Sequence, residues 1–157
     1  MEPTTGPATG RVFLDTNILA YQFDNSQAAK QHRARQVFLE LSPVAVISTQ
    51  VMVELHAVLT RKLGISKEDA EEILRSLDVE TVRTDQKMVL AAARTCARHQ
   101  ISMWDALILE AAVTASCSEL WTEDLTAGST LRGVTIVNPF SVNPTNVTSS
   151  RTSKAQA

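Results

Sequence analysis

Short apolar runs alternate with helical patterns along most of this sequence, and this alternation is the feature that most limits its fold. The runs are four or five residues long and rich in β-branched residues, which is typical of buried strands. They are Arg11–Asp15, Val44–Ser48, Val79–Val82, Glu119–Thr122 and Val134–Val137. Strands that alternate with helices are joined by right-handed crossovers, so the pattern predicts a mainly parallel sheet of short strands in a three-layer α/β/α fold.

Capping and stop residues mark the helices between these runs. Ser66 and Asp69 have the spacing of a capping box, Gly64 can end the helix before them, and Pro43 can end an earlier one. The expected helices run from Ser26 to Leu41, from Thr49 or Gln50 to Leu63, from Ser66 onward, from Gln86 to about His99 after a cap at Asp85, and from Ser102 to Ser116.

The chain of 157 residues suits a single domain, which we expect over residues 11–140. Residues 1–10 are rich in Pro, Thr and Gly and predict a flexible tail, and the Ser/Thr/Asn-rich residues 141–157 predict a disordered one. No apolar run is long enough to span a membrane. Cys96 and Cys117 lack a CxxC spacing, which favours two reduced thiols in a cytoplasmic protein.

Acidic residues stand where an open parallel sheet places its chemistry, at the carboxyl ends of the strands. Asp15 ends the first run, Asp124 follows the Glu119–Thr122 run, and Asp105 lies in the first turn of a helix. Glu54 differs, because it shares a helix face with apolar residues three before and four after it. A carboxylate on an apolar face is costly unless it is paired or binds a cation.

Each of these acids also has a purely structural interpretation. Asp15 could cap the short helix after its strand, and Asp105 stands in capping-box spacing after Ser102. Asp124 could cap a turn before Gly128. Glu54 could form a buried ion pair with an arginine such as Arg94 or Arg98.

If the acids converge instead, their mutual repulsion would keep them protonated unless a divalent cation neutralised them. Mg²⁺ and Mn²⁺ accept such oxygen ligands and keep bound waters, one of which can attack a phosphodiester. The formal net charge of −2 does not indicate nucleic-acid binding through bulk charge. A cluster of catalytic acids with a basic rim would give the same balance, however.

Four blocks in order resemble the PIN-domain nucleases, and the last strand resembles that of the VapC-like bacterial toxins. The first and second blocks are Phe13–Leu19 (FLDTNIL) and Val53–Leu55 (VEL), each containing an acid. The third and fourth are Ser102–Ile108 (SMWDALI) and Leu120–Leu125 (LWTEDL), followed by Gly128. The final strand lies in Gly133–Phe140 (GVTIVNPF). The resemblance spans about Arg11 to Phe140 and is specific only as an ordered set.

This resemblance implies a PIN-like fold and a metal-dependent endoribonuclease, the toxin of a toxin–antitoxin pair. Asp15, Asp105 and Asp124 would hold Mg²⁺ or Mn²⁺ directly or through water, and Glu54 would complete the pocket. Asn17 resembles the asparagine that orients the first acid, and Thr122 would supply a supporting hydroxyl. The resemblance further implies an RNA substrate, a homodimer and a cognate antitoxin protein.

Other residues allow two interpretations each. Glu110 and Glu123 are more typical of solvated or structural acids than of site residues. A set of basic residues could contact RNA phosphates or form a solvated helix face. They are Lys30, Arg33, Arg35, Arg61 and Lys62. Trp104 could stack on a base, but packing is favoured.

Three functions therefore compete with the toxin. One is a PIN-like nuclease in housekeeping RNA or ribosomal RNA processing. Another is a non-catalytic RNA- or protein-binding module in which the acids only cap helices. A phospho-accepting receiver domain is disfavoured, because the first strand lacks paired acids and the last strand lacks a nearby lysine.

Overall fold

A six-stranded sheet forms the centre of the computed structural model, which describes residues 10–141. The strand order is β3-β2-β1-β4-β6-β5, and every pair is parallel except the antiparallel pair β5–β6. The strands are β1 Val12–Leu14, β2 Ala45–Ser48, β3 Glu80–Val82, β4 Glu119–Trp121, β5 Thr130–Leu131 and β6 Val134–Val137. The mainly parallel, short-stranded sheet predicted from the sequence is thus confirmed.

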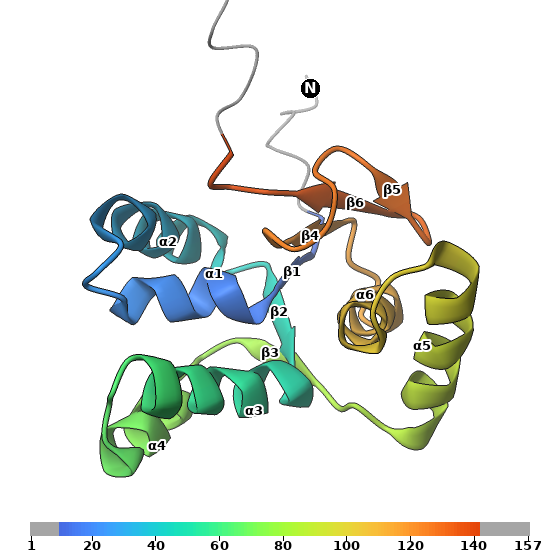
Figure 1. Ribbon diagram of the computed structural model, residues 1–157. Coiled ribbons are helices and arrows are strands. Elements are labelled where there is room, and N and C mark those ends of the chain that lie inside the picture. The colour runs from blue at the N-terminus through green and yellow to red at the C-terminus, as the bar shows by residue number, and fades with distance from the viewer. Residues whose placement is uncertain (1–9, 142–157) are drawn as a thin grey trace, which may run out of the picture.

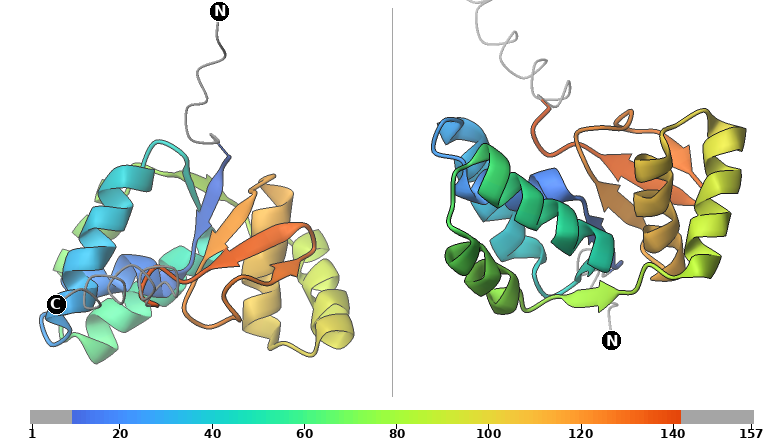
Figure 2. Two further views of the ribbon diagram at one scale, coloured as in Figure 1. Left: turned by 90° about the horizontal axis from the view of Figure 1, so that it is seen from above. Right: turned by 60° about the horizontal axis from the view of Figure 1, so that its bottom comes forward.

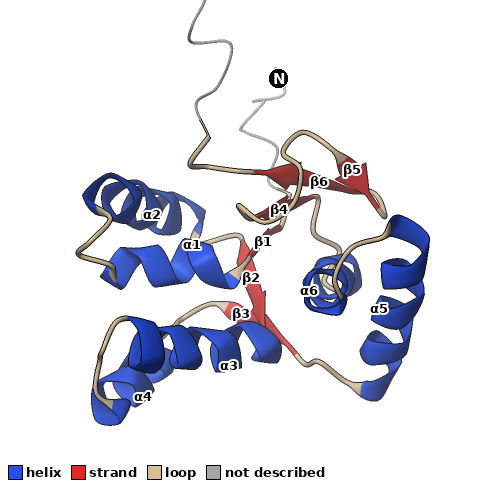
Figure 3. Ribbon diagram, in the orientation of Figure 1, coloured by secondary structure: helices blue, strands red, loops and turns tan. Residues whose placement is uncertain are grey.

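Helices cover both faces of this sheet, which gives the expected three layers. Figure 1 shows α1 to α4 on one side of the sheet and α5 with α6 on the other, and Figure 3 separates helices from strands by colour. The helices are α1 Thr16–Ala20, α2 Ala28–Leu41, α3 Thr49–Ala57, α4 Lys67–Ser76, α5 Gln86–His99 and α6 Met103–Thr114. A 3₁₀ turn, Tyr21–Phe23, follows α1, and a π-helical turn, Val58–Lys62, follows α3.

Most predicted helix boundaries agree with the structure, and the exceptions have local causes. The side chains of Ser66, Asp85 and Ser102 cap their helices as expected. The cap predicted at Ser26 is wrong, because Ser26 bonds to Asp24 and Gln27 occupies the N-cap position of α2. The edge strand β5 was not predicted, since two residues are too few to show an alternating pattern.

The core lies between the sheet and its two helical layers. β1 and β2 are buried along their whole length, because both faces of a parallel sheet are covered. The largest fully buried side chains include Phe13, Leu55 and Leu120.

Cys96 and Cys117 are free thiols. Within residues 10–141, every helix is too short or too polar to cross a membrane. The tails expected at residues 1–10 and 141–157 fall outside the described range, apart from its two end residues.

A buried ion pair ties the α5–α6 layer to the β5–β6 turn. Glu110 of α6 is 3% exposed and accepts hydrogen bonds from Arg132 at 2.9 and 3.2 Å and from the Thr95 hydroxyl at 2.5 Å. Burial alone would raise the pKa of Glu110, but the bonds from Arg132 and Thr95 hold that pKa below its usual value. Glu110 is therefore a structural acid, one of the two interpretations favoured from the sequence.

Removing Arg132 should destabilise the fold, because Glu110 would stay buried with only a hydroxyl as partner. We expect Arg132→Met to lower the free energy of unfolding at neutral pH by about 1–3 kcal/mol, since the arginine is itself half exposed. The double variant Glu110→Met with Arg132→Met should recover part of this loss. Urea unfolding monitored by circular dichroism measures both values, and equal stability of Arg132→Met and the parent would contradict the prediction.

Candidate functional site

Asp15 occupies the junction between β1 and α1, where the buried strand ends. One carboxylate oxygen accepts a hydrogen bond from the backbone N–H of Thr16 at 2.7 Å, which makes Asp15 the N-cap of α1. The other oxygen accepts a bond from the Thr122 hydroxyl at 2.8 Å. The capping interpretation is therefore correct for Asp15, but capping uses only half of this carboxylate.

The surroundings of Asp15 favour its neutral form. The residue is only 4% exposed, and burial raises the pKa of Asp15 from 3.8 to about 7. The hydrogen bonds from Thr122 and Thr16 act against this rise, while the nearby charges of Asp124 and Glu54 add to it. A positive charge beside this carboxylate would stabilise its ionised form.

Thr122 links Asp15 to Asp124. Its hydroxyl donates to Asp15 and accepts the backbone N–H of Asp124 at 3.1 Å, so one side chain fixes two acids from different segments. Thr122 is 1% exposed and directly follows β4, which pairs with β1. The supporting hydroxyl expected from the sequence is present in this position.

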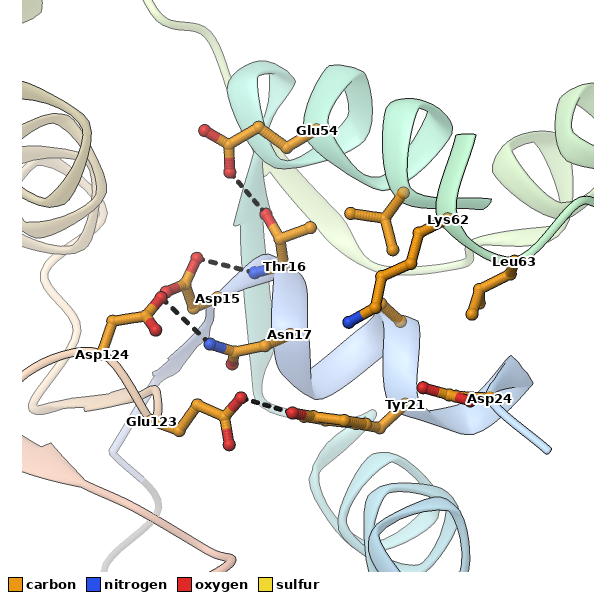
Figure 4. A pocket seen from close by; sticks show the side chains of 12 residues that line it. Asp15, Thr16, Asn17, Tyr21, Asp24, Glu54, Lys62, Leu63, Glu123 and Asp124 are labelled. Atoms are coloured by element: carbon orange, nitrogen blue, oxygen red, sulfur yellow. Dashed lines mark hydrogen bonds between the residues drawn. The ribbon is translucent and has the colours of Figure 1, made fainter. Parts of the chain in front are cut away.

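Asn17 contacts a different acid from the one expected. Its amide donates to Asp124 at 3.1 Å, as Figure 4 shows, and no bond to Asp15 is formed. The expected role of orienting the first acid is therefore wrong in this geometry. Asn17 lies in the first turn of α1, beyond the capped end, and it faces the loop after β4.

Asp124 also does not cap a turn before Gly128, whose N–H bonds to Ile136 instead.

Glu54 reaches the same region from α3. Its carboxylate accepts the Thr16 hydroxyl at 2.7 Å and the Gln50 amide at 2.8 Å. Within residues 10–141 it forms no ion pair, so the alternative of a bond to Arg94 or Arg98 does not hold. Glu54 is half-buried, as its place on a mainly apolar helix face predicted.

Asp105 lies beside the other three acids and also marks a helix start. Its backbone N–H donates to the Ser102 hydroxyl at 3.0 Å, as the capping-box spacing predicted. Burial, and then the charges of Asp105, Glu123 and Glu54, raise the pKa of Asp124, so these carboxylates act on one another. The structure thus brings the four predicted acids together, with Asp105 at the margin.

Asp15, Glu54 and Asp124 share one pocket, whose volume is about 230 Å³. Figure 4 shows their side chains converging from the β1–α1 junction, α3 and the loop after β4, and it shows the amine of Lys62 directed into the same space. Asp105 does not line this pocket. Asp105 lies in the first turn of α6, and its charge acts on Asp124.

The π-helical turn explains how Lys62 comes to line the pocket. In an α-helix, each four-residue step overshoots a full turn by about 40°, so Glu54, Val58 and Lys62 would drift around the axis. The wider π-helical turn at Val58–Lys62 offsets this drift. All three residues consequently line one wall of the pocket.

Sequence reasoning missed Tyr21, which forms the other end of the pocket. The Tyr21 hydroxyl donates to Glu123 at 2.5 Å, and Lys30 contacts the same carboxylate at 3.0 Å. Tyr21 stands in a stretch without recognisable periodicity, because α1 has only five residues. Lys30, considered for RNA contact, is already paired with Glu123.

Trp104 also differs from the expectation. Its side chain is 66% exposed, so the packing role favoured from the sequence is wrong. Trp104 stands beside Val53, which is 71% exposed, on a surface between α3 and α6.

The oxygen donors of this pocket suit a hard divalent cation. Within residues 10–141, no three His, Cys, Asp or Glu side chains are already arranged as a set of metal ligands. The composition fits nevertheless, because five carboxylates line one pocket, those of Asp15, Asp24, Glu54, Glu123 and Asp124. One of them, Asp15, is buried with a pKa near 7. Asp15, Asp124 and Glu54 could hold such an ion, and Asp105 could reach it through water.

The fold and the site together define an α/β protein with an acidic pocket at the carboxyl edge of a parallel sheet. The family model of the PIN domain matches residues 12–127. The chain therefore belongs to the PIN-domain family. A comparison with curated protein sequences found no match.

Solved structures with the same fold include several toxin–antitoxin proteins. A toxin–antitoxin complex from Klebsiella pneumoniae is 20% identical, has a TM-score of 0.64, and is matched over 83% of this chain and 99% of its own. VapC20 of Mycobacterium tuberculosis, described as a sarcin–ricin loop cleaving toxin, is 22% identical and has a TM-score of 0.61. It is matched over 72% of this chain and 91% of its own. DNA-bound VapBC from Salmonella typhimurium is 18% identical and has a TM-score of 0.60. It is matched over 80% of this chain and 96% of its own.

The raised pKa of Asp15 predicts how stability depends on pH in the metal-free protein. The folded state holds the Asp15 proton up to about pH 7 and the unfolded state only to about pH 4, so stability falls as pH rises between these values. In Asp15→Asn this decline should be smaller, with only the part due to Asp124 remaining, and the variant should be more stable than the parent near pH 8 by about 1–3 kcal/mol. Urea unfolding with a chelator present checks this, and a stability difference that does not change with pH would contradict it.

Proposed function

We propose that this protein is a metal-dependent endoribonuclease and the toxin component of a toxin–antitoxin pair, with Mg²⁺ or Mn²⁺ as its cofactor. The observation that carries the proposal is the buried Asp15 carboxylate, which shares a pocket with Glu54 and Asp124. Among residues 10–141, no basic side chain is bonded to it. Such an arrangement destabilises the metal-free fold, and a bound cation would offset this cost.

The chemistry follows from the donor set. A bound Mg²⁺ or Mn²⁺ ion would supply an acidified water for attack on a phosphodiester and would offset charge on the phosphate. Thr16 and Thr122 keep both oxygens of Asp15 in fixed directions. Asn17 holds Asp124, and the Thr16 hydroxyl with Gln50 holds Glu54.

Lys62 could bind the substrate phosphate without binding the metal ion. Its amine enters the pocket from the wall opposite Asp124 (Figure 4) and forms no ion pair with any residue between 10 and 141. The charge of Lys62 contributes to lowering the pKa of Asp24, which lines the same pocket. An amine beside carboxylates that hold a cation can also bind a phosphate oxygen next to the scissile one.

The structural neighbours support RNA as the substrate and an antitoxin as the partner. One neighbour is described as a toxin that cleaves the sarcin–ricin loop, and two are described as toxin–antitoxin or VapBC assemblies. We also propose a homodimer and a cytoplasmic location. The exposed Val53 and Trp104 offer an apolar surface for a second copy.

Cleavage by the purified protein tests the carboxylate mechanism. We expect total RNA to be cut in the presence of Mg²⁺ or Mn²⁺ and not with a chelator, and Asp15→Asn to reduce the rate about 100-fold or more. The control is Asp78→Asn, which changes an exposed acid outside the pocket in the same way. Equal rates for Asp15→Asn and the parent, with both folded, would exclude this mechanism.

Expression in a bacterial host separates a toxin from a housekeeping nuclease. A toxin produced without its antitoxin should arrest growth, and Asp15→Asn should relieve the arrest at equal protein levels, because the same carboxylate is needed for cleavage. Colony counts after induction measure this effect. Unimpaired growth with a protein that cleaves RNA in vitro would favour the housekeeping alternative.

A further inference from the structure

A second hollow lies on the helical layer that does not carry the acidic pocket. It is formed by α5 and the β5–β6 turn and has a volume of about 110 Å³. We refer to it as the arginine hollow, and its residues are Ala91, Arg94, Thr95, Arg98, His99 and Arg132. In both views of Figure 2, α5 stands at the outer edge of the molecule beside α6, so this layer is open to large ligands.

The arginine hollow has an excess of positive charge. Arg94 and Arg98 are exposed and form no ion pair with any residue in the described range. Arg132 is paired with Glu110, which lies beneath it and also accepts the Thr95 hydroxyl. Among residues 10–141, the only carboxylate bonded to a residue of the hollow is thus already neutralised, and none of them supplies a counter-charge to the other two guanidinium groups.

The placement of Arg94 and Arg98 on one helix lowers the stability of that helix. Arg94 and Arg98 are four residues apart on α5, so they stand on the same face one turn apart, where like charges repel. An anion between them would remove this repulsion. Guanidinium groups bind phosphate oxygens in a bidentate way, and the hollow has room for a single phosphate group.

The two arginines do not serve the acidic pocket. The sequence left open a buried pair between Arg94 or Arg98 and Glu54, but Glu54 bonds to Thr16 and Gln50 instead. We propose that the arginine hollow binds a backbone phosphate of the RNA outside the acidic pocket, an inference that rests on the proposed ribonuclease function.

The position of α5 allows one RNA chain to contact both places. Helices α5 and α6 form an antiparallel hairpin, and only three residues, 100–102, separate the end of α5 from the start of α6. Asp105 stands in the first turn of α6, beside the acidic pocket. The end of α5 that carries Arg98 and His99 is therefore close in the chain to the first turn of α6, which holds Asp105.

RNA binding by an inactive protein tests this inference. The probe is a fluorescein-labelled RNA hairpin, and the protein is the full chain with Asp15→Asn, so that no cleavage occurs. We expect the added pair Arg94→Gln and Arg98→Gln to weaken binding about 10-fold and to lower the slope of log Kd against log salt by about 1–2. The matched control removes two exposed positive charges on α4, with Lys67→Gln and Arg75→Gln, and should change binding little.

A titration with inorganic phosphate, followed by NMR of the arginine Nε–H groups, separates the two sources of phosphate. Equal RNA affinity with and without Arg94 and Arg98, or an equal loss in the α4 control, would overturn the proposal. If no variant binds RNA but phosphate shifts the Arg94 and Arg98 signals, the hollow binds free phosphate, and both the RNA contact proposed here and the ribonuclease function are overturned. Absence of both responses would overturn the hollow as an anion site.

Discussion

The burial of Asp15 at the junction of β1, α1 and β4 is the constraint on which the rest of the pocket depends. A carboxylate that is 4% exposed must have its oxygens bonded, and both are: one by the Thr16 backbone and the other by Thr122. These two bonds require that α1 begin immediately after β1 and that β4 lie beside it. The parallel pairing of β1 with β4 provides this geometry, because it brings the ends of both strands to one edge.

The remaining acids are held by partners that are themselves held by Asp15 or its neighbours. Thr16 gives its N–H to Asp15 and its hydroxyl to Glu54, so one residue links two carboxylates. Thr122 does the same for Asp15 and the backbone of Asp124. A change at either threonine would consequently disturb two acids at once, which distinguishes this arrangement from a set of independent surface carboxylates.

The sequence predicted the sheet well, because strand and helix patterns are local. Three of the four acids that it selected line one pocket. It could not predict which side chain each polar group contacts. Asn17 bonds to Asp124 and not to Asp15, a choice set by how the loop after β4 lies against α1. The pairing of Tyr21 with Glu123 is likewise a contact between residues about one hundred positions apart. The π-helical turn that brings Lys62 to the pocket has no sequence signature that we recognise.

The net charge of −2 hides a separation of charge that matters for binding a polyanion. The acidic pocket would repel RNA, and Lys30, at its margin, is already neutralised by Glu123. Attraction must therefore come from a cation in the pocket, from Lys62, and from groups farther away. Arg94 and Arg98 are such groups, because they have no counter-charge within the described part of the chain and lie on the layer beside Asp105. In the proposed ribonuclease, the basic hollow would therefore attract the RNA chain that the acidic pocket repels.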